Sequence, residues 1–466
     1  MFFSAYTLGC KLNQLETEAI SDSFHKKGFT LISFDKIGQP TEEPGIIVIN
    51  TCTVTSIAEQ KARRVIRKTL KECKQACVIV TGCYAQMEKS ALNALEETPE
   101  LAGRLYVIPG EKKDRLIDLA AHLAGAAGDA GEAAAGISDL PRLIASWLAD
   151  STANGGLTKD GTFHFAPESF SSHSRSFIKI QDGCDRSCAY CRVRLARGKS
   201  RSLAADEVLT RLQRLEQSGY SEAVLTGVNI SQYRDSSREL PELLELLLRE
   251  TTSIRLRLSS IEPDMITDEL LRVLENYRIR PHFHLSLQSG SAKVLAGMGR
   301  NYTPDDAAKK AALLRMARND PFIACDIIAG FPGETEDEFI KTFALCEEMN
   351  FAWIHAFPFS PRPGTAAFGF SGKVNEKEKT ERVERLNMLA VKGRREYIRR
   401  WEGKEVEAVV ERGECLPKGL AAGVTENYLK IRVNYGDDPL PRPGSLIRCR
   451  IKDIHVNSNF DATAER

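Results

Sequence analysis

The sequence predicts an α/β fold in three parts: an N-terminal doubly wound α/β domain, a central partial (βα)6 barrel and a small C-terminal β-barrel. Strand-like apolar runs alternate with amphipathic helical stretches from the start of the chain to about residue 360, which is typical of parallel α/β sheets. Beyond residue 404, short β-patterned runs separated by Gly and Pro replace the helices. The 466 residues suffice for several hydrophobic cores.

The N-terminal domain is expected to span residues 1–125, where each apolar run is followed by a stretch with helical periodicity. The Ala/Gly-rich run 125–136 and the Ser/Thr/Gly-rich run 150–174 then predict a linker over 126–174, with one short amphipathic piece around 141–148. The expected strands are 2–8, 29–34, 46–50, 77–81 and 105–108, and the expected helices are 14–27, 56–71, 86–97 and 112–123.

The central barrel is expected to span residues 175–400. Six strand-like runs indicate a partial barrel rather than the eight strands of a closed one. A long helix over 377–404 then leads into the C-terminal barrel, expected over 401–466. The expected strands of the central barrel are 177–181, 223–226, 254–258, 282–287, 322–328 and 352–357, with helices between them that include 204–217, 240–250, 305–317 and 336–349.

Composition excludes several classes of protein. The formal net charge is +1, so no global field indicates a nucleic-acid or membrane partner. No apolar run has membrane-spanning length and the N-terminus lacks the basic segment of a signal peptide, so we expect a cytoplasmic protein. Twelve cysteines in such a chain indicate metal ligands and buried thiols rather than disulfides. Apolar neighbours predict core positions for Cys325, Cys346, Cys415 and Cys449.

Cys184, Cys188 and Cys191 form a C-x-x-x-C-x-x-C run, the central cysteine run, which is the most informative feature of the chain. Three thiolates this close can bind three irons of a 4Fe–4S cluster and leave the fourth iron open for chemistry. A bacterial ferredoxin run has a different spacing and a further Cys-Pro, and no Cys or His occurs in 192–202. Structural zinc prefers four ligands in separated pairs, so zinc and a chance cluster are the weaker alternatives.

Cys10, Cys52 and Cys83 form a second group, the N-terminal cysteine trio. Each follows an expected strand, and ligand sites in open parallel sheets lie beyond the carboxyl ends of the strands. We therefore expect the three loops to converge on a second cluster with one open iron; three unrelated thiols are the alternative. Cys73 and Cys77 share one spacing of the central run but lack its third Cys, so we assign them no metal.

Short motifs rich in Gly, Ser, Gln or Glu follow the strands of the central barrel, at the face where barrel active sites lie. A cluster with an open iron can bind S-adenosylmethionine (SAM), and the protein then supplies orientation and a dry pocket. Glycines permit close approach to such a cofactor, although a turn explains each of them equally well when taken singly. The candidate SAM-binding residues are Gly227, Asn229, Ser260, Glu262, Gln288, Gly330 and Pro332.

The central cysteine run resembles that of the radical SAM superfamily, and the chain resembles the radical SAM methylthiotransferases over nearly its whole length. The C-terminal barrel is similar to a TRAM domain, a predicted RNA-binding module. The first two cysteine loops resemble the MtaB type of the family. The segments that carry the resemblance are Thr7-Leu8-Gly9-Cys10-Lys11-Leu12-Asn13-Gln14, Asn50-Thr51-Cys52-Thr53-Val54-Thr55, Ala196-Arg197-Gly198, Ser259-Ser260-Ile261-Glu262-Pro263, His284-Leu285-Ser286-Leu287-Gln288-Ser289-Gly290 and Gly330-Phe331-Pro332-Gly333-Glu334-Thr335.

The resemblance implies an enzyme that methylthiolates carbon 2 of threonylcarbamoyladenosine at position 37 of tRNA, next to the anticodon. It implies that the central run holds the 4Fe–4S cluster that binds SAM, from which a radical forms and abstracts hydrogen from carbon 2. Sulfur carried at the cluster of the N-terminal trio would then attack, and a second SAM would supply methyl. The implied partners are the tRNA anticodon stem-loop and an electron donor such as flavodoxin or ferredoxin, and a monomer is expected. The catalytic residues would be Cys184, Cys188, Cys191, Cys10, Cys52 and Cys83.

Three alternatives remain open. Methylthiotransferases that act on isopentenyladenosine in tRNA usually have Gln-Met-Asn after the first Cys, and those that act on a ribosomal protein usually have Pro-Lys-Asn, whereas this chain has Lys11-Leu12-Asn13. The third alternative, a non-catalytic RNA-binding iron–sulfur protein, would need no SAM pocket.

The chain also departs from the family after Cys191. Members commonly have a small apolar pair and Pro there, whereas this chain has Arg192-Val193-Arg194-Leu195. The two arginines could contact phosphate or shift a cluster potential through charge, or they could be solvated and inert.

Overall fold

The computed structural model describes residues 1–36, 43–101, 103–128, 137–153, 163–171, 173–236, 238–412, 416–455 and 460–465. The chain forms two compact units. Parallel α/β sheets in both units and a closed β-barrel at the C-terminal end confirm the predicted fold class. The N-terminal unit comprises Met1–Ser171, Asp182–Asp185 and Cys191–Leu203, and the C-terminal unit comprises Ser172–Gln181, Arg186–Tyr190 and Ala204–Arg466.

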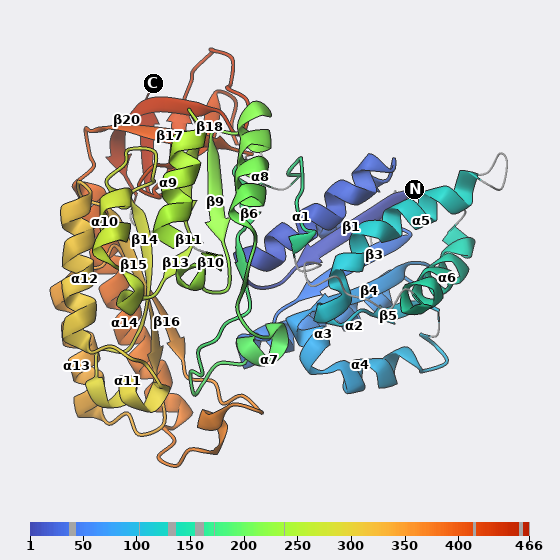
Figure 1. Cartoon of the computed structure of the whole chain (residues 1–466), viewed down its shortest axis with the longest axis horizontal. Helices are drawn as coiled ribbons and strands as arrows, with labels where there is room; N and C mark the ends of the chain where they lie inside the picture. Colours follow the sequence, from blue (N-terminus) through green and yellow to red (C-terminus); the bar gives the residue numbers. More distant parts are fainter. Residues whose placement is uncertain are drawn as a thin grey trace. The chain divides into compact units, whose positions relative to one another are not determined.

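The N-terminal unit is built on a parallel sheet of five strands in the order β2-β1-β3-β4-β5. Figure 1 labels β1, β3, β4 and β5 of this sheet. Every residue of β3 and β4 is buried, as expected for central strands covered on both faces. The strands are β1 Phe2–Thr7, β2 Thr30–Leu31, β3 Ile46–Thr51, β4 Cys77–Gly82 and β5 Leu105–Val107, and the helices that follow them include α1 Lys11–Lys26, α2 Ser56–Glu72, α3 Cys83–Met87, α4 Lys89–Glu96 and α5 Leu116–Gly128.

The two faces of this sheet pack in two separate cores. Ile46 and Val48 of β3 pack in one core with residues of α1 and α5. Ile47 and Ile49 of the same strand pack in the other with residues of α2 and α4. Side chains of a strand alternate between faces, so a continuous apolar run fills both cores. This two-sided packing is the doubly wound arrangement that the sequence predicts.

The segment expected to be a linker contributes a helix to the first of these cores. The helix α6, Leu140–Ala153, contains the amphipathic piece expected at 141–148, and its residues Ile144 and Trp147 are buried beside Phe3 of β1. Residues 129–136 and 154–162 of that segment lie outside the described residues. The N-terminal unit therefore includes α6 and continues to Ser171.

The C-terminal unit begins with a series of parallel strands. They form one sheet in the order β12-β9-β6 and a second in the order β13-β14-β15-β16. Only Ser259 separates β12 from β13, so the two sheets are successive parts of one partial barrel. The strands are β6 Ser176–Lys179, β9 Glu222–Thr226, β12 Arg255–Leu258, β13 Ser260–Ile261, β14 His282–Gln288, β15 Phe322–Ala329 and β16 Trp353–Pro358.

Helices of this unit begin where the sequence supplies capping residues. The hydroxyls of Thr267, Ser291, Thr303 and Thr335 each accept a hydrogen bond from the first turn of the helix that follows. The helices are α8 Ala205–Gln217, α9 Leu240–Glu250, α10 Asp268–Leu274, α11 Ala292–Met298, α12 Pro304–Ala317, α13 Glu336–Met349 and α14 Glu376–Arg399.

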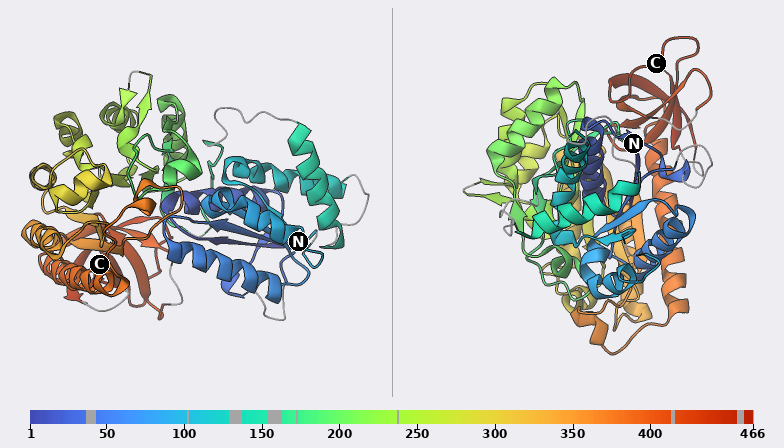
Figure 2. Two further views of the ribbon diagram at one scale, coloured as in Figure 1. Left: turned by 90° about the horizontal axis from the view of Figure 1, so that it is seen from below. Right: turned by 90° about the vertical axis from the view of Figure 1, so that its right-hand side faces the viewer.

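The chain ends in a closed barrel in the strand order β17-β18-β19-β21-β20, which follows α14 (Figure 2). Tyr397 and Ile398 of α14 and Phe322 of β15 share a core with the interior of this barrel. The barrel is therefore not an independently packed module. Its strands are β17 Glu405–Glu411, β18 Leu420–Thr425, β19 Lys430–Asn434, β20 Leu446–Ile454 and β21 Ala462–Glu465.

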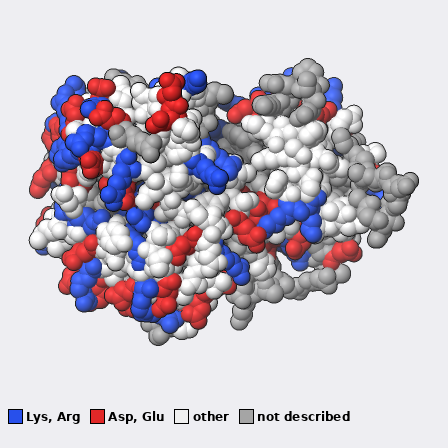
Figure 3. Space-filling model, turned by 90° about the horizontal axis from the view of Figure 1, so that it is seen from above, with Lys and Arg blue, Asp and Glu red and all other residues white. Residues whose placement is uncertain are grey.

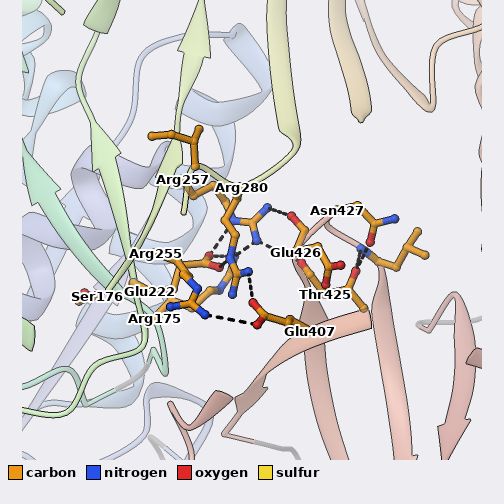
Figure 4. A network of polar contacts seen from close by, with 12 residues as sticks. Arg175, Ser176, Glu222, Arg255, Arg257, Arg280, Glu407, Thr425, Glu426 and Asn427 are labelled. Atoms are coloured by element: carbon orange, nitrogen blue, oxygen red, sulfur yellow. Dashed lines mark hydrogen bonds and ion pairs between the residues drawn. The ribbon is translucent and has the colours of Figure 1, made fainter. Parts of the chain in front are cut away.

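A buried network of charged residues, the Glu222 network, joins this barrel to β9, β12 and the segment that precedes β14 (Figure 4). Glu222, fully buried at the start of β9, accepts hydrogen bonds from Arg257 Nε at 2.7 Å and from Arg280 Nε at 2.8 Å. Arg280 also reaches Glu407 of β17 at 3.0 Å, and Arg257 Nη2 donates to the carbonyl of Thr425 at 3.1 Å. Burial would raise the pKa of Glu222, but the two guanidinium groups hold it at about 2.

The cysteines assigned to the core are placed as expected where the structure describes them. Cys325, Cys346 and Cys449 are buried free thiols, which confirms the prediction, and Cys415 lies outside the described residues. Among the described helices, none is long and apolar enough to cross a membrane.

Candidate active site

The N-terminal cysteine trio lies at one edge of the five-stranded sheet. Cys10, Cys52 and Cys83 follow β1, β3 and β4, which are neighbours in the sheet and run parallel. A Cβ atom on Gly9 would lie 2.8 Å from Cys52 Sγ, so the first two loops are in contact. Burial raises the pKa of Cys52 to about 12, and the charges of Cys10 and Cys83 add to this rise. The three thiols are therefore close enough to interact electrostatically.

Two thiols of the trio lie at the N-terminal ends of helices. Cys10 is the N-cap residue of α1, and Cys83 is the first residue of α3. Gly82, which precedes α3, has φ 96°, and a Cβ atom on it would lie 2.4 Å from the carbonyl oxygen of Thr51. The turn that places Cys83 at this edge of the sheet therefore requires glycine at position 82.

The side chain of Asn13 holds the first two cysteine loops together. Its Nδ2 donates to the carbonyl oxygens of Leu8 at 2.8 Å and Thr51 at 2.9 Å, and its Oδ1 accepts from Arg197 Nη2 at 2.8 Å. Asn50 Nδ2 donates to the Asn13 carbonyl at 3.1 Å. Sequence reasoning quoted Asn13 only as part of a motif, because its partners come from three separate segments.

Arg197 supplies a buried cation beside the trio. Its Nη1 lies 3.0 Å from Glu16 Oε1 and 3.2 Å from Asp182 Oδ1, and these contacts together with that to Asn13 form the Arg197 network. Burial alone would lower the pKa of Arg197, but the charges of Cys83, Glu16, Asp182 and Cys10 hold it well above its usual value. Arg197 therefore stays charged and stabilises anionic groups at this edge of the sheet.

The middle of the central cysteine run packs in the C-terminal unit. Arg186 Nη2 contacts both carboxylate oxygens of Asp264, at 2.7 and 2.6 Å. Arg300 donates to the hydroxyl of Tyr190 at 2.7 Å and to Glu262 at 2.7 Å. Both carboxylates follow β13, so the segment Arg186–Tyr190 in the middle of the run is attached at the carboxyl ends of the barrel strands, where barrel active sites lie.

The donors of the two cysteine groups fit iron–sulfur clusters better than a single metal ion. Among the described residues, no group of three or more His, Cys, Asp or Glu side chains is arranged to hold one metal ion. A 4Fe–4S cluster makes a different demand, because each thiolate binds a separate iron. The central run and the N-terminal trio each supply three thiols, which are the ligands that such clusters take.

Among the predicted SAM-binding residues, Asn229 is the one whose surroundings indicate a bound ligand. It follows β9, it is buried, and neither its Nδ2 nor its Oδ1 has a hydrogen-bond partner among the described residues. Ser259 Oγ, directly after β12, is also buried without a partner there. Such groups destabilise a fold unless a ligand or water satisfies them. An amide with both a free donor and a free acceptor suits the amino and carboxylate groups of SAM.

Two glycines of the predicted set are explained by close packing within the protein. A Cβ atom on Gly227 would lie 2.8 Å from Gln181 Oε1, and one on Gly330 would lie 2.4 Å from Lys379 Cγ. Pro332, in the same turn as Gly330, is buried. The turns that contain these glycines therefore need them whether or not a cofactor is bound.

Of the remaining predicted SAM-binding residues, two have side-chain contacts within the protein and one has an unusual backbone conformation. Ser260 Oγ lies 2.6 Å from His284 Nδ1, and Glu262 pairs with Arg300. Gln288, the last residue of β14, has φ 68°, a left-handed conformation that non-glycine residues adopt rarely and often at functional sites.

Sequence reasoning missed an array of polar residues on the strands of the central barrel. His284 Nε2 lies 3.2 Å from Asp326 Oδ1, and its other ring nitrogen contacts Ser260. His284 and Asp326 are half-buried on neighbouring strands, between buried apolar residues. Period-two alternation of polar and apolar residues in 282–287 is the sequence signal that could have placed His284 on one face of its strand, whereas Asp326 is the only charged residue in 322–328 and has no such pattern around it.

Comparison with known proteins identifies the same two regions. The profile of the Radical SAM superfamily matches residues 178–346, and that of the Uncharacterized protein family UPF0004 matches residues 3–102. A radical S-adenosylmethionine methyltransferase, TsrM, from Kitasatospora setae has a similar fold, with a TM-score of 0.51, 14% sequence identity and coverage of 78% of this chain and 76% of that one.

Curated relatives match over almost the whole chain. The threonylcarbamoyladenosine tRNA methylthiotransferase MtaB of Treponema pallidum (strain Nichols) is 39% identical, covering 96% of this chain and 97% of that protein. The protein of the same name from Bacillus subtilis (strain 168) is 32% identical, covering 96% and 92%. A tRNA-2-methylthio-N(6)-dimethylallyladenosine synthase of Thermodesulfovibrio yellowstonii is 29% identical, covering 97% and 96%.

Radical SAM methylthiotransferases use SAM and two 4Fe–4S clusters, which agrees with the two groups of three thiols described above. The identity to MtaB proteins covers 96% of the chain, so it extends over both units. The chain therefore belongs to the radical SAM methylthiotransferases, in the MtaB type of tRNA-modifying enzymes.

Proposed function

We propose that the protein methylthiolates carbon 2 of threonylcarbamoyladenosine at position 37 of tRNA, next to the anticodon. The relatives named for threonylcarbamoyladenosine tRNA cover the chain almost completely. The structural observation that supports the proposal is the convergence of Cys10, Cys52 and Cys83 at one sheet edge. A second group of thiols is what sulfur insertion requires beyond the generation of a radical.

The proposal gives each group of cysteines a separate role. The central run would hold the cluster that binds SAM, and the N-terminal trio would hold the auxiliary cluster. When bound, these cofactors would supply the radical that abstracts hydrogen from carbon 2, the sulfur atom and the methyl group. Electrons would come from a donor such as flavodoxin or ferredoxin, and the enzyme would act as a monomer.

The chain's own residues would orient and stabilise these groups. The unpartnered amide of Asn229 would bind polar groups of SAM, and Arg300 would keep Glu262 and Tyr190 in place beside them. Arg197 would stabilise negative charge at Cys10 and Cys83. Fixed charges and dipoles of this kind stabilise a charged site without reorganisation during the reaction.

Binding of tRNA would use exposed cations of the terminal barrel. On the face drawn in Figure 3, Lys and Arg side chains are interspersed with Asp and Glu. Deletion of the barrel would expose the core that it shares with Tyr397 and Ile398, so surface substitutions are the cleaner test. Lys418, Lys430 and Arg448 are exposed. Their joint replacement by Ala should weaken tRNA binding and flatten its salt dependence by about one unit of slope per lost phosphate contact; an unchanged salt slope would count against this surface.

Mass spectrometry of tRNA nucleosides from cells with and without the protein tests the proposed substrate. We expect the methylthio form of threonylcarbamoyladenosine to disappear without the protein and to return with the wild-type chain but not with a Cys83→Ala chain. Loss of only the methylthio form of isopentenyladenosine, or a change only in a ribosomal protein, would overturn the substrate assignment.

A further inference from the structure

The surroundings of Arg192 differ from both interpretations that the sequence offers. Its Nη1 lies 3.0 Å from Glu59 Oε1, its Nη2 lies 3.4 Å from Glu88 Oε1, and its side chain is only 5% exposed. Arg194, two positions later, is exposed. Arg192 is therefore neither solvated nor available to a phosphate: it is the centre of a buried ion pair within the N-terminal unit.

The two carboxylates that hold Arg192 follow two cysteines of the N-terminal trio. Glu59 lies in the first turn of α2, directly after the loop of Cys52, and it accepts a hydrogen bond from Thr53 Oγ1. Glu88 lies between α3 and α4, after Cys83. Arg192 itself directly follows Cys191 in the chain. Buried polar contacts thus connect the residue after Cys191 to the residue after Cys52.

Stability alone does not account for an arginine at this position. Replacing a buried ion pair with apolar side chains of similar size is often neutral or stabilising. The guanidinium Nε of Arg192 is also buried without a hydrogen-bond partner among the described residues. An ion pair fixes the relative orientation of its groups more strictly than apolar packing does, because a planar guanidinium fixes the positions of the carboxylates that it binds.

We infer that Arg192 is a positioning residue for sulfur insertion: through Glu59 and Glu88 it fixes the backbone after Cys191 against the loops that carry Cys52 and Cys83. This inference rests on the proposed function, in which a carbon radical and a sulfur donor must meet. Reaction requires near-contact geometry, and a misplacement of about 1 Å can reduce the rate by about a hundredfold. Loss of the ion pair should therefore reduce the capture of sulfur without preventing formation of the radical.

The test compares cluster-loaded wild-type protein with Arg192→Met, Glu59→Gln and the Arg192→Met/Glu59→Gln double variant. For each, 5′-deoxyadenosine formed per methylthio nucleoside is measured on the tRNA substrate, together with tRNA affinity, melting temperature and the magnetic coupling between the two reduced clusters in electron paramagnetic resonance. We expect 5′-deoxyadenosine per product to rise about tenfold in all three variants, with unchanged tRNA affinity and weaker coupling between the clusters.

The double variant separates positioning from folding, because it leaves no lone charge buried between Arg192 and Glu59. A merely structural ion pair would show recovery of both melting temperature and product ratio in the double variant, and that result would overturn the inference. Arg67→Met, at an exposed position of α2, is the matched control and should leave every quantity unchanged. If wild-type protein forms no methylthio nucleoside, the proposed function fails; if wild type forms it and Arg192→Met shows the same ratio and coupling, only this inference fails.

Discussion

The Glu222 network and the Arg197 network contain the same residue types, but they lie at different places in their sheets. In the C-terminal unit, the Glu222 carboxylate lies at the first residue of β9, where it contacts the guanidinium groups of Arg257 in β12 and Arg280 just before β14. In the N-terminal unit, the Arg197 guanidinium is surrounded by carboxylates and thiols beside the carboxyl ends of β1, β3 and β4. Ligand sites in parallel sheets lie at the carboxyl ends, so we expect the Arg197 network to act in the reaction and the Glu222 network to stabilise the fold.

The two networks also differ in the charge of the residue at their centre. A carboxylate at the centre, with its pKa held at about 2, stays anionic and attaches the terminal barrel through Arg280 and Glu407. A guanidinium at the centre stays cationic, because the charges of Cys83, Glu16, Asp182 and Cys10 hold the pKa of Arg197 well above its usual value. We therefore expect changes in the first network to affect stability, and changes in the second to affect the reaction.

Glu222→Gln should have the largest effect. It leaves the guanidinium groups of Arg257 and Arg280 buried without their carboxylate, and removal of one partner from a buried ion pair lowers the free energy of unfolding by about 3–5 kcal/mol. Urea unfolding measures this loss. Glu405→Gln, at an exposed ion pair with Arg450, is the control and should change the free energy by less than about 1 kcal/mol. Equal losses in the two variants would contradict the structural role of Glu222.

Acid should remove the contribution of Glu222 in a defined pH window. The pKa of Glu222 is lowered from 4.5 to about 2, so its contribution is fully present above pH 4.5 and is lost as the pH falls toward 2. A shift of this size corresponds to about 3 kcal/mol of unfolding free energy. The difference in stability between wild type and Glu222→Gln, followed by urea unfolding, should shrink between pH 4.5 and pH 2. A difference that stays constant with pH would contradict this assignment.

Arg197→Lys should have a smaller effect, and on the reaction rather than on folding. Lysine keeps the charge but lacks the planar group that reaches Asn13, Glu16 and Asp182 together. Loss of a charge-assisted hydrogen bond is worth about 1.5 kcal/mol, so methylthio product should form about tenfold more slowly. Glu16 keeps its contact with Lys113 at 2.5 Å, which limits the loss of stability. If Arg197→Lys formed product at the full rate but lost much of its stability, the Arg197 network would have a structural role, contrary to our expectation.

The sequence predicts much of the fold and both cysteine groups, because these depend on local patterns. Apolar runs locate the strands of both sheets, and the placement of Cys10, Cys52 and Cys83 after three strands predicts their meeting, since parallel strands end at one edge. The burial of α6 could not be predicted, because its pattern around 141–148 does not reveal which surface covers it.

Ion pairs between residues that are distant in the chain also could not be predicted from the sequence. Arg192 meets Glu59 and Glu88 from two other segments, and no spacing rule connects them. The glycines at 227 and 330 were ambiguous for a related reason. Their close neighbours, Gln181 and Lys379, are set by packing rather than by the local motif.

The central claim is that the two cysteine groups perform separate steps, and paired variants test it most directly. Reconstituted Cys184→Ala and Cys83→Ala proteins are given SAM, a reductant and tRNA, and both 5′-deoxyadenosine and methylthio nucleoside are quantified. We predict that Cys184→Ala forms neither product, whereas Cys83→Ala forms 5′-deoxyadenosine but no methylthio nucleoside. Methylthio nucleoside from Cys83→Ala at the wild-type level would contradict the account.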